Sequence, residues 1–206
     1  SGLVCAWIVI MCCWCAAHPL KEENCMKPVP YWLGLLMTGL LMTMWHCGAL
    51  AEQLCLPDAI AASTPLENFV VEKATVVDRT TGLMWTRCFA GVSGEGCDEG
   101  EAKLMSWPAA LQYAAKMNQE SFLGYRNWRV PNIKELTSIA EVQCANPALN
   151  PALFPAAPPL KVWSSSPYSL YPHYSWFFDF KDHTTSNLER FKTFAVLLAR
   201  DIESDR

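Results

Sequence analysis

The sequence has no excess of basic residues. Its 16 lysines and arginines stand against 20 aspartates and glutamates, for a formal net charge of −4. This balance excludes a nucleic-acid interface that depends on a broad cationic face. Charged residues make up only 17% of the chain and hydrophobic residues 51%, which excludes intrinsic disorder. The chain has no repeat or low-complexity segment, and its 206 residues are too few for two large domains.

The first apolar run is also shorter than a membrane span. It extends from Leu3 to Ala17 and falls short of the roughly 20 residues that a spanning helix needs. Because this run precedes Met26, we interpret 1–25 as an upstream extension or a fragment artefact. A membrane segment at this position is the alternative.

A second apolar run follows Met26-Lys27-Pro28 and ends in Gly48-Ala49-Leu50-Ala51. A short positive segment, an apolar stretch and an A-x-A site form the pattern of a secretory signal peptide. We therefore expect 26–51 to be a signal peptide that is cleaved near Ala51, and membrane contact only through this segment. A lipoprotein anchored at Cys47 is a weaker alternative, because bulky residues stand where small ones are needed.

The exported part of the chain lacks the cysteine spacing of a zinc site. Cys55, Cys88, Cys97 and Cys144 include no C-x-x-C pair and no nearby pair of histidines. An even number of cysteines in an exported protein predicts two disulfides, in one of three connectivities. The glycine-rich segment 89–96 favours a local bridge between Cys88 and Cys97, which would leave Cys55 to pair with Cys144. A nucleophilic cysteine is not expected, since an oxidising compartment would consume the free thiol.

Two helices are expected in the exported part. Ser106 and Pro108 begin the first, which runs to about Asn118 with Leu111, Ala114, Ala115 and Met117 facing inward. Asn132 and Glu135 form a capping box for the second, which runs to about Ala140. Five prolines over 147–159 exclude regular structure there.

Short strands complete an α+β domain. Residues 52–68 are an extended lead-in, and a hairpin is expected over 69–86 around the turn cluster 78–82. A polar turn is expected at 183–187. The remaining strands are expected at 162–165, 176–180 and 191–200.

Several short sequence motifs follow one another along this chain. They are TGLMW at 81–85, SWPAAL at 106–111, GYRNWRVPNIKEL at 124–136, Phe154-Pro155, VWSSS at 162–166, WFFDF at 176–180 and the terminal 195–200. In this order they resemble the Lcl C-terminal domain family, bacterial exported domains formerly of unknown function, over about 75–200. The resemblance implies a C-type-lectin-like α+β domain of short antiparallel strands, two helices and long ordered loops, which we place at 69–206. It also implies exported, adhesin or pilus-associated proteins.

The chain departs from the family pattern at four positions. Ala114 and Leu198 stand where the pattern has cysteines, Asn127 where it has Asp and Val130 where it has Leu. If the two family cysteines pair, this chain places Ala114 against Leu198 with apolar packing instead of a bridge. The calcium motifs of C-type lectins, E-P-N or Q-P-D with a downstream W-N-D, are absent, so calcium-dependent sugar binding is not implied.

Most of the shared residues are interpreted as structural. Arg129 is expected to hold a loop by pairing with Glu135 or Asp179. The serines after Trp163 lie in no G-x-S-x-G elbow, so their hydroxyls are expected to satisfy backbone groups of the loop rather than to attack a substrate. The residues assigned to this structural set are Trp85, Trp107, Trp128, Arg129, Pro131, Glu135, Trp163, Ser164, Ser165, Trp176 and Asp179.

The candidate binding residues lie on a proline-broken aromatic loop. Tyr168, Tyr171 and Tyr174 are too many tyrosines for one such loop to bury, and tyrosine supplies rigid, half-polar contact area. His173 lies among them, and Arg126 is added as a candidate cation. Neither a metal site nor a cofactor is expected.

We therefore expect a non-catalytic exported binding module, periplasmic or at the bacterial cell surface, that recognises a glycan or an envelope protein. A structural part of a surface appendage is the alternative, and an enzyme on a formylglycine-generating-like fold is a third. A sulfated glycan is a polyanion, and a protein with a net charge of −4 lacks the overall field to attract it. It would need a local cluster, either Arg126, Arg129 and Lys134 or Arg190 with Lys192.

Overall fold

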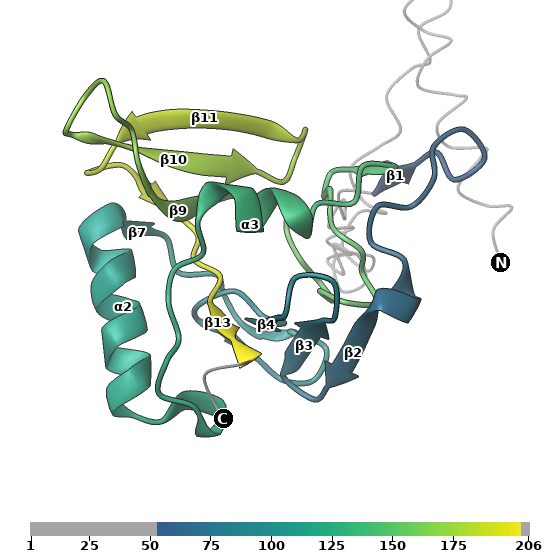
Figure 1. Ribbon diagram of the computed structural model, residues 1–206, viewed down its shortest axis with the longest axis horizontal. Coiled ribbons are helices and arrows are strands. Elements are labelled where there is room, and N and C mark those ends of the chain that lie inside the picture. The colour runs from purple at the N-terminus through teal and green to yellow at the C-terminus, as the bar shows by residue number, and fades with distance from the viewer. Residues whose placement is uncertain (1–52, 203–206) are drawn as a thin grey trace, which may run out of the picture. The chain divides into compact units, whose positions relative to one another are not determined.

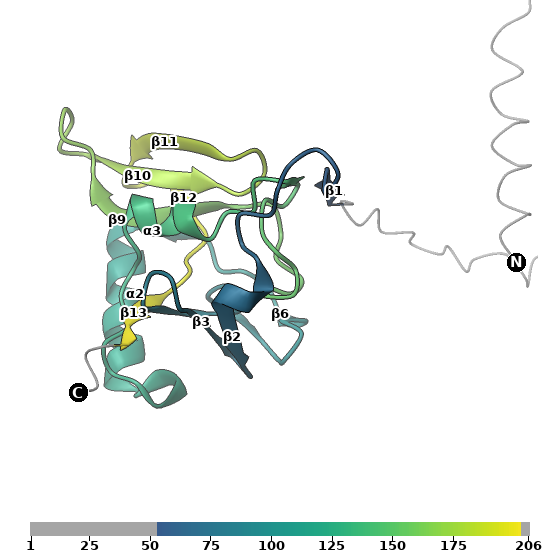
Figure 2. The same ribbon diagram turned by 45° about the vertical axis from the view of Figure 1, so that its right-hand side comes forward.

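The computed structural model describes residues 53–202, and the expected segments 1–25 and 26–51 lie outside this range. The described chain is α+β, as expected, with short antiparallel strands around two α-helices (Figure 1). Two larger sheets lie one above the other in both views, with α2 along one side (Figure 2). The more specific lectin-like label stays a prediction.

The lower sheet has four strands in the order β13-β4-β3-β2. They are β2 (Phe69–Glu72), β3 (Thr75–Asp78), β4 (Leu83–Thr86) and β13 (Ala199–Asp201). The expected turn joins β3 to β4, where the Asp78 carboxylate accepts hydrogen bonds from the Thr80 amide at 2.8 Å and the Thr81 hydroxyl at 2.7 Å. Gly82 takes a φ of +70°, a conformation that costs glycine little.

The single first strand expected over 69–77 is wrong. The chain turns back at Lys73, which has a φ of 42°, and β2 and β3 pair with each other. Both arms of this turn are rich in β-branched residues, so strand preference alone does not reveal the reversal.

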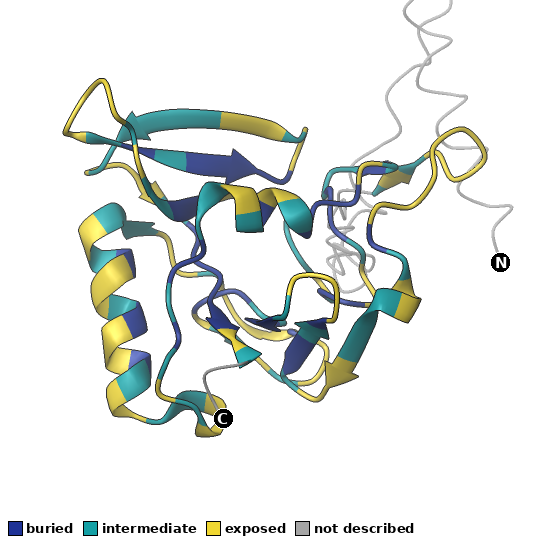
Figure 3. Ribbon diagram, in the orientation of Figure 1, coloured by how far each residue is buried: buried dark blue, intermediate teal, exposed yellow. Residues whose placement is uncertain are grey.

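The upper sheet has the order β11-β10-β9. It contains β9 (Lys161–Pro167), β10 (Tyr174–Asp179) and β11 (Thr184–Glu189). The polar turn expected at 183–187 is therefore wrong, because most of that segment is the edge strand β11. Edge strands tolerate polar side chains since one side of the strand and much of its face meet water, as Figure 3 shows for β11.

The end of the chain crosses from the upper sheet to the lower one. The strand expected over 191–200 is interrupted: β12 (Thr193–Phe194) pairs with β7 (Met105–Ser106), and β13 joins the lower sheet. Between them, alternate side chains enter two different core clusters. Ala195 and Leu197 enter one, and Val196 and Leu198 enter the other. Because this extended segment buries side chains in a core cluster on each of its two sides, its sequence is uniformly apolar.

Helix α2 (Trp107–Gln119) buries Ala110, Ala114 and Met117. These positions lie three and four residues apart and so share one helical face. The expectation that Leu111 and Ala115 face inward is wrong, since both are exposed on the neighbouring face. Ser106 occupies the N-cap position, although its side chain makes no capping hydrogen bond.

Helix α3 (Ile133–Ser138) begins with the expected capping box. The Asn132 side chain accepts from the Glu135 amide at 3.0 Å, and the Glu135 carboxylate accepts from the Asn132 amide at 2.7 Å. The helix ends two residues earlier than expected. The proline-rich segment after it has no helix or strand, yet its Leu149, Leu153 and Phe154 complete the core.

Both disulfides join the cysteine pairs that the sequence favours. Cys88 pairs with Cys97, and Cys55 pairs with Cys144. The second bridge joins two short paired strands, β1 (Leu54–Cys55) and β8 (Cys144–Ala145). The remaining short elements are the 3-10 turns Leu66–Asn68 and Phe122–Gly124 and the pair β5 (Val92–Ser93) with β6 (Glu99–Gly100).

A buried carboxylate holds the lead-in against the domain. Glu141 is 1% exposed and accepts hydrogen bonds from the Thr64 hydroxyl at 2.6 Å and from the amides of Ser63 and Thr64 at 3.0 Å each. Burial raises the pKa of Glu141, but these hydrogen bonds and one from the Gln143 amide outweigh it and hold the pKa below its ordinary value. The lead-in is thus bound to the domain by this carboxylate as well as by the disulfide.

Glu141→Ala is expected to lower the free energy of unfolding by about 2–3 kcal/mol at neutral pH, because several donors lose a charged acceptor. The contribution of a carboxylate with a lowered pKa is fully present above the ordinary glutamate value of 4.5 and is lost as the pH falls through the lowered pKa. Urea unfolding at several pH values between 7 and 3 measures this. Glu141→Gln, of equal size, should converge with the wild type in acid. A difference between the two that stays constant with pH would contradict the role of the charge.

Candidate binding groove

An open groove of about 750 Å³ lies where the loop between β9 and β10, the turn between β11 and β12 and the start of α2 meet. Its lining is mostly apolar, with a few polar groups. The lining residues are Ser106, Pro108, Pro172, His173, Tyr174, Glu189, Arg190 and Phe191. Its volume lies within the range of about 300–1,000 Å³ that ligand sites commonly have.

Arg190 joins the three segments that form the groove. Its guanidinium stacks on the Trp107 ring with Cζ 4.1 Å from the ring centroid, and its Nε donates to the Ser175 hydroxyl at 2.8 Å. Its amide donates to the His173 carbonyl at 2.8 Å, and its carbonyl accepts from the Trp107 amide at 2.9 Å. The base of the groove is therefore held in place without a ligand.

The three tyrosines of the candidate loop form one aromatic cluster. The ring centroids of Tyr168 and Tyr171 lie 6.0 Å apart, and those of Tyr171 and Tyr174 lie 5.5 Å apart. Tyr168 packs edge-on against Trp176 at 5.3 Å. Tyr171 is 58% exposed, so the cluster presents a free ring beside the groove.

Tyr174 and Glu189 form a hydrogen-bonded pair at the groove wall. The Tyr174 hydroxyl donates to Glu189 Oε1 at 2.9 Å. This bond raises the pKa of Tyr174, while the Glu189 pKa is lowered first by its own backbone amide and then by the Tyr174 hydroxyl. At neutral pH the wall thus offers a neutral phenol and an ionised carboxylate.

Arg126 does not belong to this groove. It follows the C-terminal end of α2, whereas the groove lies at the N-terminal end, and a helix of 13 residues is about 20 Å long (Figure 1). Arg126 Nε donates to the Ser121 hydroxyl at 2.6 Å. Sequence reasoning missed Phe191, which is 70% exposed at the groove. An aromatic residue between Arg190 and Lys192 in a turn was the available signal.

Comparison with family models bears out the resemblance. A model described as the Lcl C-terminal domain matches residues 74–200, more than half of the chain. The chain belongs to the Lcl C-terminal domain family. A comparison with curated proteins finds no match.

The two positions at which this Lcl C-terminal domain lacks the family's cysteines lie in one buried cluster. Ala114 on α2 is 5% exposed, and Leu198 is 2% exposed. Trp128 and Val130 belong to the same cluster. Apolar packing therefore occupies both positions, as expected from the sequence.

Arg129 of the Lcl C-terminal domain binds two carboxylates. It donates to both oxygens of Glu135, at 2.7 and 3.0 Å, and forms an ion pair with Asp201 at 3.1 Å. These hydrogen bonds, that of Glu135 first, raise the Arg129 pKa. The alternative partner Asp179 is excluded, since Asp179 lies 4.0 Å from Lys161 instead. Within the cluster that a sulfated glycan would need, the charge of Arg129 is therefore balanced by these two carboxylates.

Three polar side chains within the motifs shared with the family donate to backbone carbonyls. The Ser164 hydroxyl donates to the Trp176 carbonyl at 2.8 Å. The Trp107 indole donates to the Ser164 carbonyl at 2.8 Å, and that of Trp163 to the Met105 carbonyl at 2.9 Å. Within 53–202, no group of three or more His, Cys, Asp or Glu side chains has the arrangement of a metal site. In the same range, no helix has the length and apolar character of a membrane span.

Proposed function

We propose that this Lcl C-terminal domain protein is an exported, non-catalytic binding module and that the groove beside Arg190 is its recognition site. The observation that carries the proposal is the pair of exposed rings, Tyr171 and Phe191, beside a groove whose base is already held rigid. Rigid aromatic surface with a few fixed polar groups is typical of recognition sites. The engagement of Ser164 and of all four described cysteines in structural bonds supports a role without catalysis.

Export is supported by the two disulfides, which suit an oxidising compartment. We propose a signal peptide over 26–51 and a location in the periplasm or at the cell surface. Intact mass of the secreted chain would test this: a mature N-terminus at Glu52 is expected, and retention of 26–51 would contradict it.

A neutral glycan is the ligand that suits the groove best. Arg190 is already stacked and hydrogen-bonded, and Glu189 contributes a negative charge, so a sulfated polyanion would meet little free positive charge. A sugar ring has an apolar face of C–H groups for Phe191 or Tyr171 and hydroxyls for Glu189 and His173. A neutral polymer also agrees with the net charge of −4.

Phe191→Ala and Tyr171→Ala are each expected to weaken binding of a neutral glycan by about tenfold, because each removes a stacking surface. A glycan array followed by calorimetry on the best neutral hit measures the change. Arg126→Ala is the matched control, since this exposed residue lies outside the groove, and it should bind as the wild type does.

Retention on a heparin column that depends on Arg126 would contradict the neutral-glycan proposal. So would glycan binding that is equal in Phe191→Ala and the wild type.

A structural part of a surface appendage is the second candidate, and one observation favours it. Phe191, which lines the groove, and Leu170, on the loop that contributes Pro172 to it, are each 70% exposed. Exposed apolar side chains are typical of protein interfaces. This candidate predicts no binding to any glycan on the array. It also predicts stable association with one envelope protein that Phe191→Ala weakens.

A further inference from the structure

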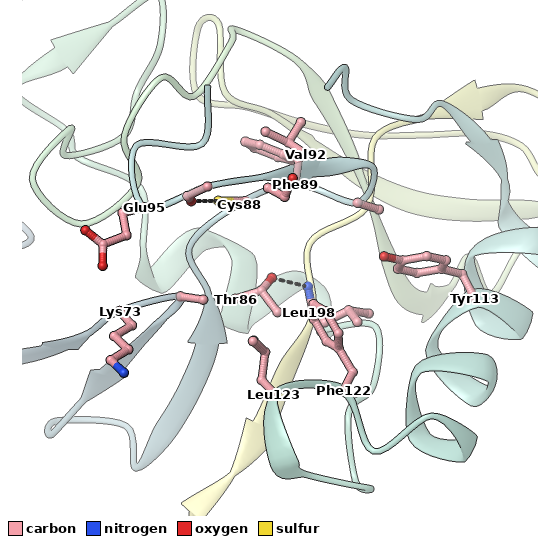
Figure 4. Close-up of a pocket in the computed structure, with 14 residues that line it drawn as sticks. Lys73, Thr86, Cys88, Phe89, Val92, Glu95, Tyr113, Phe122, Leu123 and Leu198 are labelled. Carbon is pink, nitrogen blue, oxygen red and sulfur yellow. Dashed lines mark hydrogen bonds between the residues drawn. The ribbon is translucent and has the colours of Figure 1, made fainter. Parts of the chain in front are cut away.

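A second cavity, with no lining residue in common with the groove, lies between β4, the loop closed by Cys88–Cys97 and the turn after α2 (Figure 4). Its volume is about 340 Å³. Most of its wall is apolar. The apolar side chains are those of Phe89, Ala90, Val92, Phe122, Leu123 and Leu198.

Two hydroxyl groups in this wall have unused hydrogen-bonding capacity. The Tyr113 hydroxyl points into the cavity (Figure 4) and has no hydrogen-bond partner among residues 53–202. Thr86 is 5% exposed, and its hydroxyl oxygen accepts from the Leu198 amide at 3.2 Å. The hydroxyl hydrogen of Thr86 has no acceptor in the described part of the chain. A ligand that supplies an acceptor to these hydroxyls forms a hydrogen bond without displacing an existing one within the protein, and so gains affinity.

The charges at the cavity favour a neutral ligand. Lys73 and Glu95 lie at the end away from Tyr113 (Figure 4), and their opposite signs leave no net charge. Burial, and then the charge of Glu120, raise the pKa of Tyr113. Its hydroxyl therefore stays protonated at neutral pH and is available as a donor.

The walls of the cavity are fixed before any ligand binds. The Cys88–Cys97 disulfide closes the loop on one side. The Ala90 amide donates to the Val196 carbonyl at 2.9 Å, and the Ala90 carbonyl accepts from the Lys103 amide at 2.8 Å. A preformed apolar cavity of this kind binds with little ordering cost.

We propose that this cavity binds a small neutral aromatic molecule that carries one carbonyl or hydroxyl group. The ring lies among Phe89, Phe122 and Leu198. The polar group accepts a hydrogen bond from the hydroxyl of Tyr113 or Thr86. This site is independent of the groove and of the function proposed for it.

The test uses calorimetry and ligand-observed NMR on the full-length chain, with acetophenone and p-cresol as probes and benzoate as the charged counterpart of acetophenone. Both neutral probes are expected to bind saturably, and benzoate about tenfold or more weakly, because the apolar wall does not solvate its charge. Tyr113→Phe should weaken binding by about five- to tenfold through loss of one hydroxyl. Leu123→Trp, at a partly exposed wall position, should block the cavity.

Phe191→Ala, in the groove, should leave the binding of both probes unchanged, which separates this site from the proposed glycan site. Thermal unfolding of each variant shows whether it is folded. Two results would overturn the proposal: no saturable binding of either neutral probe, or affinities that are the same in Leu123→Trp, Tyr113→Phe and the wild type.

Discussion

Replacing Cys55 and Cys144 together by alanine is expected to lower the free energy of unfolding by about 4.5 kcal/mol. The bridge spans 89 residues and so restricts a large part of the unfolded chain. The cost of closing such a loop grows slowly with its length. Equilibrium unfolding in urea under non-reducing conditions measures the loss.

The matched control is the alanine replacement of Cys88 and Cys97, whose bridge spans only nine residues. This variant is expected to lower the free energy of unfolding by about 2.5 kcal/mol, because the bridge closes a shorter loop. Equal losses for the two double variants, or a larger loss for the shorter loop, would contradict this loop-length account.

Arg200→Ala is expected to lower the free energy of unfolding by about 3–4 kcal/mol, because it leaves a cavity and removes the partner of polar groups. Arg200 is fully buried, with Nε donating to the Asn127 side chain at 2.7 Å. Its guanidinium lies on the Tyr125 ring, with Cζ 3.9 Å from the centroid. These contacts connect β13 to the segment after α2.

Arg129→Ala is the comparison within the same region. The Arg129 side chain is 36% exposed, and ion pairs with this access to water contribute about 1 kcal/mol or less. In urea unfolding, the free energy of unfolding of Arg200→Ala should be well below that of Arg129→Ala. Equal stabilities would show that burial does not distinguish the two arginines.

Local chemistry predicted several features correctly. The capping box of Asn132 and Glu135 depends on residues three apart, and the Asp78 turn depends on residues two and three apart. The cysteine pairs followed from loop composition and from the even number of thiols. In each case the atoms that decide the structure are close in sequence, or few alternatives exist.

Errors arose where pairing over long distances decided the outcome. The reversal at Lys73 splits a β-branched run because β3 pairs with both β2 and β4. The polar segment 184–189 is a strand because β10 offers it an edge. On α2, the choice between Ala110 and its neighbour Leu111 depends on which face meets the core.

The candidate binding site, too, was predicted only in part from the sequence. Tyrosines on a proline-broken loop indicated a recognition surface, and the structure gathers Tyr168, Tyr171 and Tyr174 into one cluster. Arg126 was grouped with them by charge, but it follows the C-terminal end of α2, whereas the groove is lined by residues at its start. Phe191 was missed because the fold, and not the sequence spacing, brings the β11–β12 turn to the start of α2.

The sequence by itself determined the family, the α+β class, the two disulfides and the local caps and turns, since these depend on neighbouring residues or on specific short motifs. Only the tertiary structure decided how 195–199 divides its side chains between two cores and how Arg190 joins three segments into a groove. It also decided that apolar walls enclose a cavity beside Tyr113. These features arise from contacts between residues far apart in the chain, whose geometry local preference does not encode.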